Sequence, residues 1–124
     1  MKNAINWFEI PTRNLDNAVT FYEAVLGLPI KREDFGGVPH GVLSADKDAV
    51  AGALVADAKR TPGSGGTLIY LDCRDSVPAA VERAKKAGAQ IILPVTSIGP
   101  FGWIAVIRDL DGNEVGLHAE APAS

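Results

Sequence analysis

Glu9 is the carboxylate in this sequence that is best placed to act as a base. It stands in residues 4–11, "AINWFEIP", which alternate as a β-strand and end at a proline. A carboxylate on the inward face of such a strand must be paired or open to a pocket, and burial there would make it a usable general base. We interpret Glu9 as a candidate catalytic and ligand-binding residue. A structural salt bridge or an exposed rim position would explain it equally well.

Two further titratable side chains lie near the end of the chain, in the expected strand 113–118. His118 could shuttle a proton, because histidine titrates near neutral pH. Glu114 points to the same face of the strand, but four residues separate the two backbones by roughly 13 Å. They therefore cannot hold one ion together. Both are candidate ligand contacts, and His118 is a second candidate catalytic residue, with packing at a strand end as the alternative.

Four more side chains could line a site for a small molecule: Trp7, His40, Tyr70 and Trp103. Strand alternation places Trp7 on the face of Glu9. Tyr70 could donate a hydrogen bond to a carbonyl group, and His40 follows "GGVP" where a loop meets a strand. Trp103 follows "GPFG", whose glycines would let a lid move or would only shape a turn. Ordinary packing is the alternative for all four.

The elements that would position these residues occur twice, 61 residues apart. The strand 4–11 is followed by the N-cap Asn14, an amphipathic helix and the C-cap Gly27. The strand 66–73 is followed in the same way by Ser76, a second helix and Gly88. Further strands are expected at about 29–33, 39–45 and 50–55, and again at about 90–94, 102–108 and 113–118. Each half therefore has the order βαβββ.

These elements predict an α+β fold in which two tandem modules form a curled mixed β-sheet around a cleft, with the helices outside. The modules are expected at about 3–55 and 67–119, joined by a linker at 56–66 that contains "TPGSGG". We expect one domain over 1–124. The "DLDGN" segment at 109–113 is interpreted as a turn, because Asp and Asn bond their own backbone and glycine accepts a positive φ.

Composition excludes several classes of protein. The net charge is −3 and the basic residues are scattered, which argues against nucleic acid as a partner. No apolar stretch reaches the roughly 20 residues of a membrane span. The N-terminus does not resemble a secretory signal, and the single cysteine, Cys73, cannot form an internal disulfide. A cytoplasmic location is expected.

Three segments together resemble the vicinal oxygen chelate superfamily, which includes glyoxalase I, bleomycin-resistance proteins and extradiol dioxygenases. They are "FEIPTRNLDNAVTFYEAVLGL" at 8–28, "RAKKAGAQII" at 83–92 and "DLDGNEVGL" at 109–117. The resemblance covers nearly the whole chain and is closest to the small glyoxalase-related members. It implies a cleft between the halves and a homodimer. It does not assign an activity, because one fold hosts many chemistries.

The resemblance also implies where a metal would lie. Metal-dependent members carry one ligand on the first and fourth strands of each half. The corresponding positions here are Trp7, Leu68 and Gly116, and the strand at 50–55 contains no His, Asp, Glu or Cys. All four positions lack a ligand, so we expect no metal and no other cofactor.

The sequence thus predicts a glyoxalase/bleomycin-resistance-like protein that binds a small organic molecule in the cleft without the usual metal. The alternative is a lyase or isomerase of the glyoxalase-related type that acts next to a carbonyl, with Glu9 as base. Glyoxalase I and extradiol dioxygenase activities are disfavoured, because both need the metal. A structural or regulatory module is a third possibility.

Overall fold

The computed structural model describes residue 5 and residues 7–43, 49–74 and 76–120. Its two halves each hold one α-helix and four strands. The first half comprises β1 (Trp7–Pro11), α1 (Leu15–Leu26), β2 (Ile30–Phe35), β3 (Val38–Leu43) and β4 (Ala51–Val55). The second comprises β5 (Tyr70–Asp72), α2 (Val77–Lys86), β6 (Gln90–Ser97), the 3₁₀ turn η1 (Gly99–Phe101), β7 (Trp103–Arg108) and β8 (Glu114–Ala119). The α+β class with two tandem βαβββ modules is confirmed.

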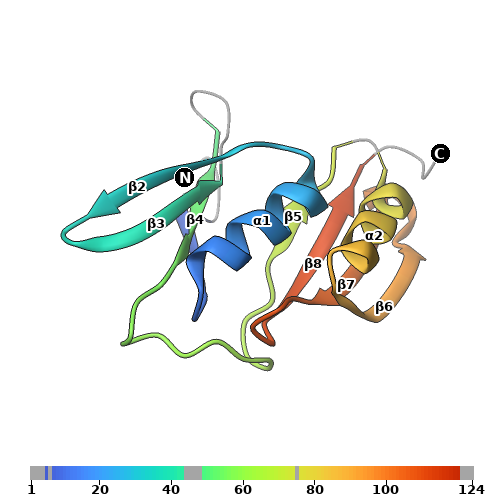
Figure 1. Cartoon of the computed structure of the whole chain (residues 1–124). Coiled ribbons are helices and arrows are strands. Elements are labelled where there is room, and N and C mark those ends of the chain that lie inside the picture. The colour runs from blue at the N-terminus through green and yellow to red at the C-terminus, as the bar shows by residue number, and fades with distance from the viewer. Residues whose placement is uncertain (1–4, 6, 44–48, 75, 121–124) are drawn as a thin grey trace.

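The strands form two four-stranded mixed sheets, one from each half (Figure 1). The strand order is β1-β4-β3-β2 in the first sheet and β5-β8-β7-β6 in the second. β1 pairs parallel with β4, and β5 pairs parallel with β8, whereas the other pairs are antiparallel. Within the described residues, β1 and β5 are therefore edge strands, and each has one side without a strand partner.

The β2–β3 hairpin is longer than the sequence patterns predicted. Gly36 and Gly37 form its two-residue turn with φ values of 62° and 81°, as a type I′ turn requires. Phe35 then pairs with Val38 in the first position after the turn. The strand expected at about 29–33 therefore continues to Phe35 and carries an aromatic side chain into the hairpin.

Both helices begin where the sequence signals place them and α1 ends at Gly27 as predicted, whereas the C-cap of α2 is Ala87, one residue before the predicted Gly88. The Asn14 side chain accepts a hydrogen bond from the backbone N–H of Asn17, and the Ser76 side chain accepts one from that of Ala79. Gly27 ends α1 in the left-handed conformation, and Gly88 follows α2 with a φ of 103°. The caps satisfy backbone groups that have no partner inside the helix.

One hydrophobic core runs through both halves, because α1 packs against α2 and each helix covers one face of its own sheet. The phenol of Tyr22, on α1, donates a hydrogen bond of 2.7 Å to Asp109 Oδ2 in the β7–β8 turn. Asn113 in the same turn donates to the carbonyl of Pro11. Asp109 also accepts from the backbone N–H groups of Asp111 and Asn113. The segment is a turn, as predicted, and it also joins the halves.

Two arginines of the second half bind the C-terminal end of α1. Arg74 Nη2 donates to the carbonyl of Leu26 at 2.7 Å, and Arg83 Nε donates to that of Val25 at 3.0 Å. These carbonyls lie in the last turn of α1, where no backbone N–H group of the helix remains to donate to them. The helix dipole also favours positive charge at this end. The contacts fix the position of α1 relative to α2.

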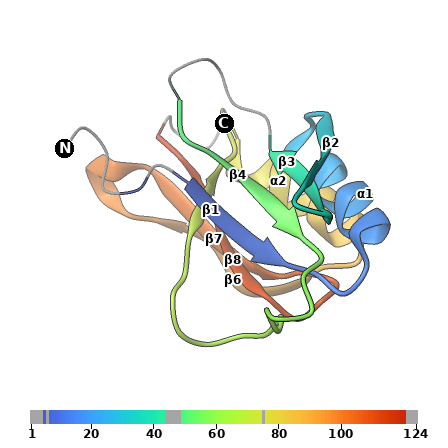
Figure 2. The ribbon, with the colours of Figure 1, turned by 90° about the vertical axis from the view of Figure 1, so that its left-hand side faces the viewer.

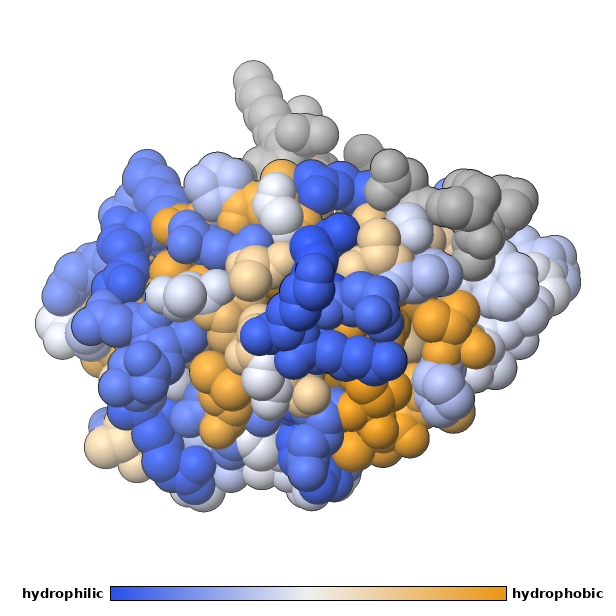
Figure 3. All heavy atoms as spheres, turned by 45° about the vertical axis from the view of Figure 1, so that its right-hand side comes forward, coloured by the Kyte–Doolittle hydropathy of each residue, from blue (hydrophilic) through white to orange (hydrophobic). Residues whose placement is uncertain are grey.

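The outer face of α2 is hydrophilic. The helix buries Val77, Ala80, Val81 and Ala84, and it exposes charged side chains such as Glu82 and Lys85. Figure 3 shows this side of the molecule, where hydrophilic side chains separate the apolar ones. Neither helix described here is long and apolar enough to cross a membrane.

Candidate functional site

Each sheet has one face that no helix covers. In the first sheet a Cβ added at Gly41 would contact Val19 and Leu15 of α1, so Gly41 faces the helix and its neighbour His40 faces away. We call the uncovered face the first open face; its residues include Trp7, Glu9, Phe35, His40 and Ala53. Figure 2 shows β1 and β4 from this side, with no helix in front of them.

The second open face follows from the same alternation. Leu71, Ile107 and Leu117 belong to the core, so the residues between them point to the opposite side. The second open face includes Tyr70, Asp72, Glu114, Gly116 and His118. Tyr70 pairs with Gly116, and Asp72 pairs with His118.

Glu9 lies at the centre of a polar group on the first open face. Trp7 Nε1 donates a hydrogen bond of 3.2 Å to Glu9 Oε2. His40 Nε2 lies 3.9 Å from the same oxygen. His40 Nδ1 makes a hydrogen bond of 2.8 Å with the carbonyl of Val38. The structure therefore brings together three of the residues that the sequence singled out.

Glu9 is exposed, which is one of the positions that the sequence left open for it. Its side chain is 41% exposed, because β1 is an edge strand and the described residues place no element over this face. His40 is the buried member of the group, with its side chain only 9% exposed.

Phe35 is a residue of this site that the sequence patterns missed. Its ring contacts the His40 ring edge to face, with the ring centres 4.7 Å apart. A hollow of about 320 Å³ touches His40 but lies mostly on the helix side of the sheet, lined by Leu15, Arg32, Glu33, Asp34, Pro39 and His40. The Gly36-Gly37 pair was the available signal, because a two-residue hairpin turn fixes which residues lie opposite each other.

On the second open face, Tyr70 covers the glycine where the family resemblance would place a metal ligand. A Cβ added at Gly116 would lie 2.1 Å from Cδ1 of the Tyr70 ring. No side chain fits there unless Tyr70 moves. The other positions carry Trp7, Leu68 and the apolar strand β4. Among the described residues, no three His, Cys, Asp or Glu side chains form a group that could hold a metal. The residues do not fit the metal centre of the metal-dependent members.

The charged residues of the second open face are engaged with neighbours. Glu114 Oε2 accepts a hydrogen bond of 2.7 Å from Arg108 Nη2, which neutralises its charge. His118 Nε2 lies 2.7 Å from the carbonyl of Phe101 in η1. A carbonyl only accepts, so Nε2 must carry a proton, and only Nδ1 could accept one. Glu114 and His118 thus hold strands and a loop in place.

Trp103 does not lie on the second open face. The sequence analysis grouped Trp103 and Ala105 with the cleft, but Ala105 is fully buried under α2 and Trp103 packs on the same core. The cause is the pairing register of β7 with β8, in which Trp103 pairs with Ala119 and Ala105 pairs with Leu117, both core residues. Ile104 pairs with His118 and takes the outward position instead. The exposed aromatic of the loop is Phe101, at 73%.

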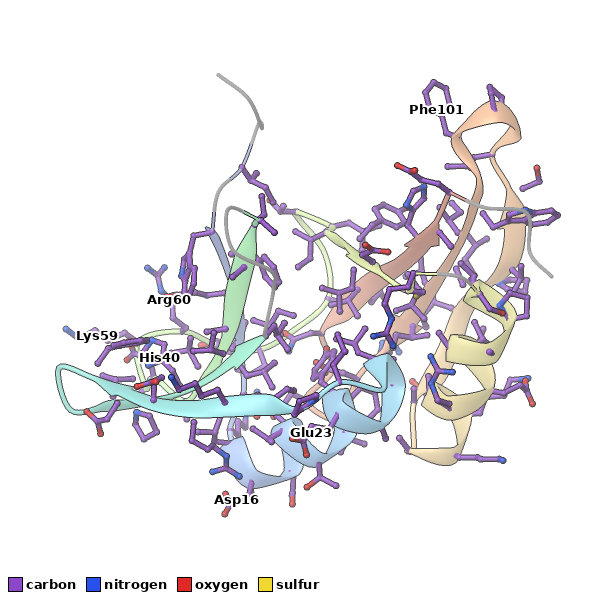
Figure 4. All side chains as sticks on the ribbon, turned by 90° about the horizontal axis from the view of Figure 1, so that it is seen from above. Asp16, Glu23, His40, Lys59, Arg60 and Phe101 are labelled. Atoms are coloured by element: carbon purple, nitrogen blue, oxygen red, sulfur yellow. The ribbon has the colours of Figure 1, made fainter. Side chains whose placement is uncertain are left out.

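The candidate residues therefore form two groups rather than one. Trp7, Glu9 and His40 share the first open face, whereas Tyr70, Glu114 and His118 share the second. Figure 4 shows His40 and Phe101, which contacts His118, at opposite ends of the molecule. The second surface hollow, of about 360 Å³, lies between Thr12, Arg13 and the 56–62 segment and touches neither group.

Two other titratable groups lie in the core. Burial raises the pKa of the Cys73 thiol to about 11, which makes it a poor nucleophile near neutral pH. Burial, followed by the negative charge of Asp109, raises the pKa of Tyr22 well above its ordinary value. Both groups are structural.

Comparison with known proteins identifies the family. Residues 4–117 match the family described as "Glyoxalase/Bleomycin resistance protein/Dioxygenase superfamily". The chain is 31% identical over 117 residues to "Putative glyoxylase CFP32" of Mycobacterium tuberculosis and of Mycobacterium bovis. The match covers 94% of this chain and 44% of those proteins, so the chain spans less than half of their length.

Two solved structures illustrate the structural similarity. A superfamily member from Sphaerobacter thermophilus superimposes with a TM-score of 0.68 at 20% identity, covering 95% of this chain and 98% of that one. TnmS3, an antibiotic-binding protein from a Streptomyces species, superimposes with a TM-score of 0.63 at 25% identity, covering 95% of this chain and 96% of that one.

Proposed function

The chain belongs to the glyoxalase/bleomycin resistance protein/dioxygenase superfamily, and from this membership we propose that it binds a small organic molecule on its open faces without the family's usual metal. Small-molecule sites are mostly apolar, with a few polar groups that orient the guest. The open faces have this composition. The chemical class of the guest is treated separately below.

Exposed aromatic and apolar side chains are the observation that carries this proposal. Trp7 is 43% exposed, Leu68 40% and Tyr70 45%. Trp7 stands on the first open face beside Glu9, and Tyr70 stands on the second beside Gly116. Apolar surface gathered beside polar groups in this way marks a binding surface more often than chance exposure.

The absence of suitable ligands supports metal-free binding. The ring of Tyr70 fills the space above Gly116, and on the first open face no third His, Cys, Asp or Glu among the described residues joins Glu9 and His40 in a metal-binding group. A divalent transition ion needs three or more N, O or S donors at roughly 2 Å. We therefore disfavour metal-dependent isomerisation and oxygenation.

We further propose that a second copy of the chain completes the site. In one copy the two open faces belong to different sheets, and β1 and β5 each have an unpaired edge. An edge strand invites pairing with another chain. Pairing β1 of one copy with β5 of the other in a symmetric dimer would bring the first open face of one copy beside the second open face of its partner.

The antibiotic-binding neighbour adds support for a binding role. TnmS3 has the same fold over nearly the whole of both chains. A role in sequestering or carrying an organic molecule requires no catalytic group, which agrees with the engaged state of Glu114 and His118. Which compound is bound is a matter for experiment.

A thermal-shift screen of aromatic and drug-like compounds tests the proposal, with protein that has been treated with a chelator. We expect compounds that raise the melting temperature of the wild type, and we expect Trp7→Ala and Tyr70→Ala to abolish the shift. Leu110→Ala removes a side chain that is also half exposed, at 51%, from the β7–β8 turn and serves as the control. A shift that appears only when a transition metal is added back would contradict metal-free binding.

A further inference from the structure

The tautomer of His40 is fixed by its surroundings. Nδ1 lies 2.8 Å from the carbonyl oxygen of Val38. A carbonyl oxygen can only accept, so Nδ1 carries a proton and Nε2 of the neutral ring carries a lone pair. The ring is 91% buried, by the 9% exposure of its side chain, and it packs edge to face on Phe35. Nε2 is therefore held as a hydrogen-bond acceptor.

A second acceptor faces this nitrogen. Glu9 Oε2 lies 3.9 Å from His40 Nε2, which is too long for a hydrogen bond. An ionised carboxylate also only accepts. The single donor that either atom receives within the described residues is the indole N–H of Trp7, to Glu9 at 3.2 Å. Two acceptors thus lie 3.9 Å apart, and no hydrogen bond of the described residues joins them.

Glu9 is one of several carboxylates that form no ion pair with a lysine or arginine among the described residues. Lys31 pairs with Glu33 on the same sheet, Arg32 pairs with Asp16, and Arg108 pairs with Glu114. Among the described residues, Glu9 has no lysine or arginine within 4.0 Å, and its single ionic contact is with His40. Its negative charge is left for a partner from outside.

We propose that the ligand of the first open face carries a protonated amine or amidine on an aromatic body, and that its N–H groups bind between Glu9 Oε2 and His40 Nε2. This inference rests on the proposed function, because it names the class of molecule that the same site binds. The charged hydrogen bond to Glu9 is stronger than a neutral one. The exposed ring of Trp7 provides an aromatic surface for the cation and for the rest of the ligand.

Isothermal titration calorimetry with three naphthalene compounds tests the proposal. 2-Naphthylmethylamine carries the cation, 2-naphthylmethanol has a neutral donor in the same place, and 2-naphthoate carries a negative charge. The titrations are run at about pH 8, above the reference histidine pKa of about 6.5. We expect the amine to bind wild-type protein about tenfold more tightly than the alcohol and the carboxylate to bind most weakly.

Glu9→Gln keeps the shape of the side chain and removes its charge, and its amide N–H can bond His40 in place of a ligand. We expect this variant to bind the amine and the alcohol equally. Glu82→Gln makes the same change of charge on the exposed face of α2 and should retain the preference for the amine.

The outcomes separate this inference from the proposed function. If the wild type binds the amine and the alcohol with equal affinity, or if Glu9→Gln retains the preference, the inference is wrong and small-molecule binding stands. If the wild type binds none of the three compounds, the inference is wrong, and the thermal-shift screen decides the proposed function separately.

Discussion

Replacing Tyr22 with phenylalanine removes one hydroxyl from the contact between the two halves. Tyr22 is 1% exposed, and its phenol donates to Asp109 Oδ2 at 2.7 Å. A hydrogen bond to a charged group contributes about 1.5–3 kcal/mol. Asp109 retains donors from Asp111 and Asn113 in the variant. We therefore expect Tyr22→Phe to lower the free energy of unfolding by about 2 kcal/mol.

The same residue makes stability depend on alkaline pH. Because the pKa of Tyr22 is raised in the folded state, the folded chain keeps a proton that the unfolded chain releases above about pH 10. This contribution is complete below about pH 10. Above it, the wild type loses up to about 1.4 kcal/mol of stability per pH unit that Tyr22→Phe does not lose. Cys73, with its pKa raised to about 11, adds the same trend to both proteins, so it cancels in the comparison.

Urea denaturation followed by circular dichroism at about pH 7 and about pH 11 measures both effects. Tyr70→Phe is the matched control, because Tyr70 is the only other tyrosine and is 45% exposed. We expect its stability to equal that of the wild type at neutral pH. Equal stability of Tyr22→Phe and wild type at both pH values would show that the bond to Asp109 does not hold the halves together.

Three further predictions concern the open faces and the core. Neither Trp7→Ala nor Tyr70→Ala should bind ligand alone. Refolding an equal mixture of the two variants should restore about a quarter of the sites, because half of the dimers are mixed and each mixed dimer has one intact site. If calorimetry shows no recovery of binding, the two copies do not share a site. Gly116→Ala should lower the free energy of unfolding by about 1–3 kcal/mol, because the added methyl group clashes with the Tyr70 ring. Adding Tyr70→Ala should reverse part of this loss. If urea denaturation shows that the effects of the two substitutions simply add, residues 70 and 116 are not in contact. Cys73, 3% exposed, should react with iodoacetamide at about pH 8 only after urea is added, as mass spectrometry would show.

Local rules predicted the repeated module well. The caps at Asn14, Ser76 and Gly27 depend on a few neighbouring residues, and the structure places all three as expected. The shared face of Trp7 and Glu9 follows from the alternation of one strand. These features need no knowledge of the rest of the fold.

Long-range packing accounts for what the sequence patterns missed. The position of Trp103 on the core side of its sheet depends on the register of β7 with β8, which alternation within one strand does not indicate. The exposure of Glu9 depends on β1 being an edge strand, and therefore on sheet order. The bond from Tyr22 to Asp109 spans 87 residues. Each of these results from contacts between segments that are distant along the chain.

The outer edges of the two sheets carry features that resist aggregation. β2 reads "IKREDF", with four consecutive charged residues, and β6 has Pro94 and two register shifts. Charge, proline and bulges all discourage a strand from adding to another sheet. β1 and β5 carry fewer of these features, with Pro11 only at the last position of β1. Self-association is thereby directed to β1 and β5, and growth into fibres from β2 and β6 is opposed.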